Sequence, residues 1–110
     1  MSALNKMAAE EQIRRIREME AALNEARAAV RGFDEAMERY AAAQEAVRKL
    51  SAYYGSEDWK ADFAADEAGE LPRDLPRGVL SEDGIWDVLE ENRELLARML
   101  ELSAQIVREG

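Results

Sequence analysis

The chain has 110 residues, of which 47% are hydrophobic and 35% charged, and its net charge is −9. It contains no cysteine and no histidine, which excludes disulfides, thiolate chemistry and every catalytic or metal site that needs either residue. This length supports one modest core, so we expect a single helical domain over residues 1–110. Helix-forming residues dominate and β-branched residues are sparse, which predicts an all-α fold.

The first predicted element is a long helix over residues 6–52, roughly 70 Å in length. Its apolar positions alternate spacings of three and four without a slip, which is the heptad pattern of a coiled coil. We call these positions the heptad stripe; they are Ile16, Met19, Leu23, Ala26, Val30, Phe33, Met37, Tyr40, Gln44 and Val47.

Gly32 allows an alternative, a compact three-helix bundle in which the first helix breaks at this glycine. Arg27 and Arg31 precede it and Asp34 follows, an order that suits one helix ending and another beginning. However, the apolar phase continues across Gly32, and a helical hairpin has no reason to preserve it. We therefore favour the unbroken helix.

A C-terminal helix is predicted over residues 82–108, packed antiparallel against the first. Ser81 is the expected N-cap, and Gly84 is a weak helix former in the first turn. Being shorter, this helix covers only about half of the heptad stripe, although each buried Leu, Ile or Met contributes about 1.5–3 kcal/mol. We therefore expect a homodimer formed through the N-terminal part of the stripe.

Residues 53–81 are predicted to form a short helix followed by an ordered strap. Ser56 is placed to cap a helix over Glu57–Asp66, and Gly69 to end it. Pro72 and Pro76 then impose extended backbone on the residues before them. The apolar residues expected to anchor the strap are Leu71, Leu75, Val79 and Leu80.

The whole charge imbalance lies in residues 55–91, which contain twelve acidic and three basic residues. Such a field repels phosphate backbones, so we expect no nucleic-acid partner, whereas a basic protein surface would be attracted. Residues 1–20 hold no apolar run that could serve as a signal peptide or membrane span. A cytoplasmic location without membrane attachment is therefore expected.

The acidic segment contains candidate ligands for Mg²⁺ or Ca²⁺, which prefer oxygen donors. These are Asp58, Asp62 and Asp66, spaced by four on one helix face, together with Glu82, Asp83 and Asp87. We favour the interpretation that they form a solvated acidic face.

Glu-x-x-Glu-like spacings suggest a small Mg²⁺-dependent phosphohydrolase as an alternative. They occur at Glu35 and Glu38, Asp87 and Glu90, and Glu91 and Glu94. In a chain with 24 acidic residues such pairs arise by chance, and no basic cluster accompanies them to hold a triphosphate.

Aromatic residues cluster where the short helix begins. Tyr53, Tyr54 and Trp59, with Asp62 and Arg77, could form a partner-binding patch. More often such a cluster closes the end of a helical bundle, with tyrosine hydroxyls reaching water or a carboxylate. In that case Arg77 is the natural ion-pair partner of Asp62 or Asp66.

Several runs resemble one family of small bacterial proteins, the domain-of-unknown-function family 4298. The runs are LSAYYGSEDWKAD over 50–62, DEAGELP over 66–72, RGVLSED over 77–83 and DVLEENREL over 87–95, with QIRRI over 12–16. The resemblance implies a helical fold and carries over no catalytic residue. We therefore predict no catalytic residue, no cofactor and no resident metal. The expected role is a non-enzymatic protein–protein interaction module that self-associates, and the alternative is the metal-dependent phosphohydrolase or a metal-binding helical protein.

Overall fold

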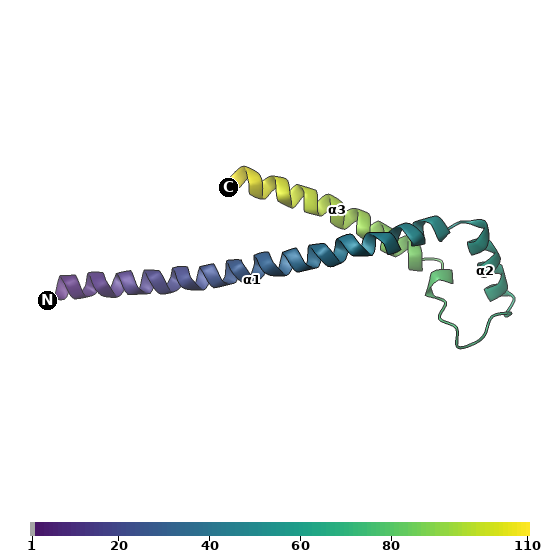
Figure 1. The fold of residues 1–110 in the computed structure, drawn as a ribbon, viewed down its shortest axis with the longest axis horizontal. Coiled ribbons are helices and arrows are strands. Elements are labelled where there is room, and N and C mark those ends of the chain that lie inside the picture. The colour runs from purple at the N-terminus through teal and green to yellow at the C-terminus, as the bar shows by residue number, and fades with distance from the viewer. Residues whose placement is uncertain (1) are drawn as a thin grey trace. The chain divides into compact units, whose positions relative to one another are not determined.

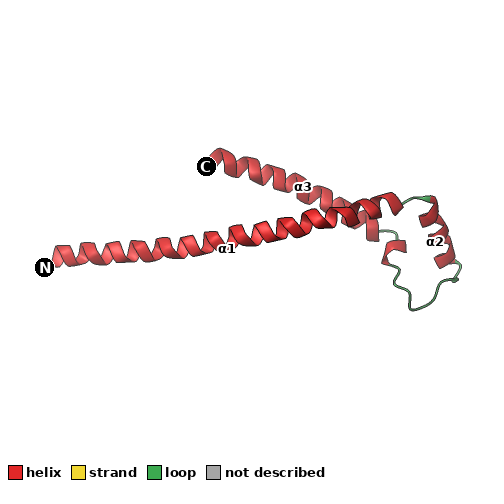
Figure 2. Cartoon of the chain, viewed as in Figure 1, coloured by secondary structure: helices red, strands yellow, loops and turns green. Residues whose placement is uncertain are grey.

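The computed structural model describes residues 2–110, and within them the chain is all-α. The elements are α1 (Ala3–Tyr53), α2 (Glu57–Glu67), the 3₁₀ helix η1 (Gly78–Leu80) and α3 (Gly84–Glu109) (Figure 1). The described residues contain no strand (Figure 2). The predicted fold class, with a long N-terminal and a C-terminal helix, is confirmed.

The helix α1 passes through Gly32 without a break, so the alternative of a bundle broken there is wrong (Figure 1). An exposed glycine costs a helix only about 1 kcal/mol, which the hydrogen bonds on both sides readily offset. The helix also begins earlier than predicted, because the Ser2 hydroxyl accepts a hydrogen bond from the Asn5 amide at 3.2 Å.

The chain divides into two compact units, residues 1–43 and residues 44–110. Among the described residues, the first unit contains only the N-terminal part of α1. This unit therefore contains no second helix to cover the heptad stripe, and no residue of α1 is buried. The second unit contains the end of α1 together with α2, η1 and α3.

Local signals bound α2 as the sequence predicts. The Ser56 hydroxyl accepts a hydrogen bond from the Trp59 amide at 3.1 Å and so caps the helix. After the helix ends, Gly69 adopts a φ of +71°, a left-handed conformation that glycine accepts without steric cost. The helix extends one residue beyond the predicted end, to Glu67.

The second unit has a small core at the joint between η1 and α3. Leu80 and Ile85 are the buried hydrophobic residues of the described chain, at 6% and 2% exposure. Leu71 is half-buried, so Leu71 and Leu80 anchor the strap as predicted. Leu75 and Val79 remain 44% and 39% exposed, and the prediction that they are anchors is wrong.

The start of α3 differs from the prediction by two residues, since the helix begins at Gly84. Ser81 ends η1, where its hydroxyl donates to the Gly78 carbonyl at 2.7 Å. The same hydroxyl accepts a hydrogen bond from the Gly84 amide at 3.0 Å. Ser81 thus satisfies one helix amide as expected, although the N-cap position itself belongs to Asp83.

Gly84 is required by a close approach that the sequence did not reveal. A Cβ at this position would lie 2.3 Å from the Gly78 carbonyl oxygen and 2.6 Å from the Ser81 hydroxyl. No side chain fits there without moving the backbone of η1.

None of the helices in residues 2–110 combines the length and the apolar character needed to cross a bilayer.

We predict that Gly84→Ala destabilises the second unit by about 1–3 kcal/mol, because the added methyl group overlaps the Gly78 carbonyl. Both tryptophans, Trp59 and Trp86, lie in this unit, so urea denaturation followed by tryptophan fluorescence measures the change. An unchanged midpoint would mean that the joint between η1 and α3 tolerates a Cβ.

The matched control is Gly32→Ala in α1. A Cβ on Gly32 meets no atom within 4 Å, so this change should stabilise the helix by about 0.5–1 kcal/mol. Thermal denaturation followed by circular dichroism should show a higher midpoint for Gly32→Ala.

Candidate functional site

Three aromatic side chains pack against one another at the start of α2. The rings of Tyr54 and Trp59 meet edge to face at 5.3 Å, and those of Trp59 and Phe63 stack at 5.2 Å. The indole N–H of Trp59 donates to the Val79 carbonyl at 2.9 Å. The cluster therefore ties α2 to the end of the strap, and the polar group of Trp59 is used inside the unit.

Tyr53 and Asp62 form the second contact of this region. The Tyr53 hydroxyl donates to a carboxylate oxygen of Asp62 at 2.6 Å. Losing this hydrogen bond on ionisation, together with partial desolvation and the charges of Asp62 and Asp58, raises the pKa of Tyr53 to about 12. The expectation that a tyrosine hydroxyl reaches a carboxylate is confirmed.

Arg77 fastens the strap to α2. Its guanidinium donates to Asp66 Oδ1 at 2.5 Å and to the carbonyl of Pro72 at 2.6 Å, and its Nε donates to the Leu75 carbonyl at 3.3 Å. The Arg77 and Asp66 side chains are 35% and 23% exposed. The predicted ion pair is confirmed with Asp66 rather than Asp62, and the planar fork of arginine lets one side chain hold several acceptors.

The six candidate metal ligands do not converge. Within residues 2–110, no group of three or more acidic residues is arranged to hold a metal ion. Asp62 and Asp66 are engaged by Tyr53 and Arg77. Asp83 and Asp87 lie at the N-terminus of α3, where their negative charges interact favourably with the positive end of the helix dipole.

The phosphohydrolase alternative gains no support from the structure either. Its candidate pairs lie on α1 and α3, and one member, Glu90, forms an ion pair with Arg93 at 3.0 Å. None of these pairs belongs to a metal-binding group among the described residues.

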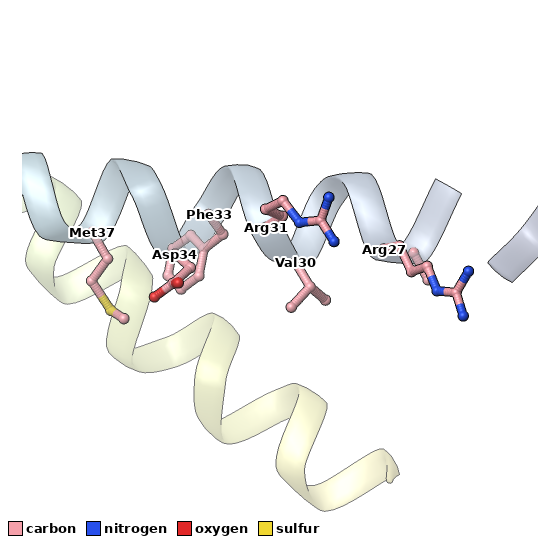
Figure 3. A pocket seen from close by; sticks show the side chains of 7 residues that line it. Arg27, Val30, Arg31, Phe33, Asp34 and Met37 are labelled. Atoms are coloured by element: carbon pink, nitrogen blue, oxygen red, sulfur yellow. The ribbon is translucent and has the colours of Figure 1, made fainter. Parts of the chain in front are cut away.

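A different surface stands out on α1 in the first unit. An open hollow follows the heptad stripe, lined by Ala26, Arg27, Val30, Arg31, Phe33, Asp34 and Met37. Figure 3 shows Val30 and Met37 projecting from the same side of the helix, with charged side chains beside them. Arg27 and Asp34 were interpreted from the sequence as signals of a helix end. Their positions directly after Ala26 and Phe33 in the heptad repeat place them beside the stripe, and this spacing is visible in the sequence.

One comparison with known proteins gives a match. A family model described as "Domain of unknown function (DUF4298)" matches residues 16–102. The matched range begins at the first residue of the heptad stripe and includes α2, the strap, η1 and most of α3. No curated protein and no solved structure matches the chain.

We predict that Tyr53 ionises with a midpoint near pH 12 rather than at its ordinary value of 10.0. Because the folded state raises this pKa, the stabilisation from the hydrogen bond is complete below pH 10.0 and is lost as the pH rises towards 12. The difference between the alkaline ultraviolet titrations of the wild type and Tyr53→Phe reports this group alone. Asp62→Asn should lower the midpoint, and an unchanged midpoint would remove Asp62 as the cause.

We predict that Arg77→Met destabilises the second unit by about 1–2 kcal/mol, because Asp66 and two carbonyls lose their donor. Hydrogen exchange of the amides in residues 70–80 should accelerate at the same time. Arg77→Lys should restore only part of the loss, since an ammonium cannot reproduce the fork. Arg73→Met, on the same strap, is the control and should leave both measurements unchanged.

Proposed function

We propose that this chain, which belongs to the DUF4298 family, is a non-enzymatic protein–protein interaction module that self-associates through the heptad stripe of α1. The observation that carries the proposal is the exposed stripe of the first unit. Ile16, Met19, Val30 and Phe33 are 53%, 59%, 70% and 55% exposed. Contiguous apolar surface of this kind marks an interaction site on a soluble protein.

The periodicity of the stripe specifies the kind of partner. A heptad seam is complementary to another helix with the same repeat, because each apolar knob enters a hole between four residues of the facing helix. A second copy of the chain offers such a helix in every cell that makes the protein. Burying several Ile, Leu, Met and Phe side chains at about 1.5–3 kcal/mol each is enough to offset the cost of association.

The polar groups of the second unit favour a binding role over catalysis. The residues most suggestive of chemistry, Asp62, Asp66 and Arg77, are each engaged in a contact that holds the unit together. What remains available on that unit is its excess of acidic side chains. This supports a second surface that meets a basic protein partner by electrostatic attraction.

We predict that the protein sediments with the mass of two chains at tens of micromolar, as measured by analytical ultracentrifugation. Val30→Asp, which places a charge in the seam, should weaken the dimer at least about a hundredfold. Ala28→Glu, on the opposite side of the same helix, should leave it intact. A wild-type protein that stays monomeric at this concentration contradicts the proposed function.

A further inference from the structure

We infer that two copies of α1 pair antiparallel, in the register that places Glu20 of each chain beside the partner's Arg27. This inference rests on the proposed function, because it specifies the geometry of the proposed dimer. It is carried by the two flanks of the heptad stripe, which differ sharply from each other.

One flank of the stripe is charged from Glu20 to Asp34, and the other is small after Arg15, which precedes Ile16. The residues that directly follow Met19, Ala26 and Phe33 are Glu20, Arg27 and Asp34, so their charges alternate in sign. The residues that directly precede Leu23, Val30, Met37 and Gln44 are all alanine: Ala22, Ala29, Ala36 and Ala43.

The three charged residues of the flank have no ion-pair partner within residues 2–110 of their own chain. Elsewhere on α1 such pairs do form, for example between Arg48 and Glu45 at 3.0 Å. Glu20, Arg27 and Asp34 are therefore available to a second chain.

The difference between the flanks selects the orientation. In a parallel pair the charged flank of one helix faces the other flank of its partner. Glu20 would then meet the partner's Arg15, but Arg27 and Asp34 would meet only the methyl groups of Ala22 and Ala29. In an antiparallel pair like flanks face each other, and charges meet charges. The two alanine flanks then also meet, which lets the helix backbones approach closely.

The alternating signs select the register. With Leu23 opposite the partner's Ala26, Glu20 lies beside the partner's Arg27 on both sides of the two-fold axis. A shift of one heptad places Arg27 beside the partner's Arg27, and Glu20 beside the partner's Asp34. That register replaces each attraction with a repulsion between like charges.

A shift of two heptads restores opposite charges but places Ile16 and Met19 over the partner's Val47 and Gln44. Both of those residues are half-buried within the second unit and are less available. The inferred register instead uses only the first unit. It seats the partner's Leu23, Met19 and Ile16 over Ala26, Val30 and Phe33, the residues that line the hollow (Figure 3).

Pulsed electron–electron double resonance, which measures the distance between two spin labels, tests orientation and register together. The chain has no native cysteine, so only the introduced cysteines are labelled. Spin labels on Glu10→Cys should lie about 45 Å apart in the dimer, and labels on Asn24→Cys within about 20 Å, given 1.5 Å per residue. Short distances at both positions would show a parallel dimer and overturn the inference. About 65 Å at position 10 would show the register shifted by two heptads and overturn it too.

Charge exchange provides the second test, with dissociation constants measured by sedimentation. Glu20→Arg and Arg27→Glu should each raise the constant about tenfold, since each replaces two attractions with repulsions. The double variant should return to the wild-type value at unchanged helix content. The register is wrong if Arg27→Glu leaves the dissociation constant unchanged. It is also wrong if the wild-type constant returns only when Arg27→Glu is combined with Asp34→Arg. A monomeric wild type would instead contradict the proposed self-association.

Discussion

The second unit depends on the close approach of the backbone at Gly84 to the carbonyl of Gly78. Ser81 completes this joint, since its hydroxyl bonds to both glycines. The joint turns the chain from η1 into α3 and places Leu80 and Ile85 where they are buried. The other contacts of the strap attach beside it, because Trp59 binds the Val79 carbonyl and Arg77 directly precedes η1. These directional contacts converge on one short segment beside the small core.

The same contacts determine what the second unit has left to offer. Asp66 and Arg77 neutralise each other, and Asp62 accepts a hydrogen bond from the Tyr53 hydroxyl. The side chains that the sequence suggested as a functional site thus hold α2, the strap and the end of α1 together. Its remaining acidic residues give the unit a strong negative field without a metal-binding geometry among the described residues. Such a field attracts positively charged groups.

The first unit presents the opposite chemistry. Its acidic and basic side chains nearly balance, and its distinguishing feature is an apolar seam with nothing inside the unit to cover it. The seam is bordered by Glu20, Arg27 and Asp34 on one side and, after Arg15, by alanines on the other. The two units therefore differ in surface chemistry: one exposes an apolar heptad stripe, and the other carries an excess of acidic side chains.

The sequence by itself determined the helices, because helix formation depends on neighbours three and four residues apart. The unbroken phase of α1, the Ser56 cap and the left-handed turn at Gly69 are all local signals, and each was readable. The family resemblance also came from the sequence, through short runs along the chain. Tertiary structure alone decided which carboxylate Arg77 binds, which strap side chains face inward, and where α3 begins. The partner of Arg77 and the burial of the strap side chains depend on groups that are distant in the chain, since proline fixes the backbone of the strap but not the direction of Leu75. The start of α3 depends on the turn of η1, because the Ser81 hydroxyl bonds to Gly78 as well as to Gly84.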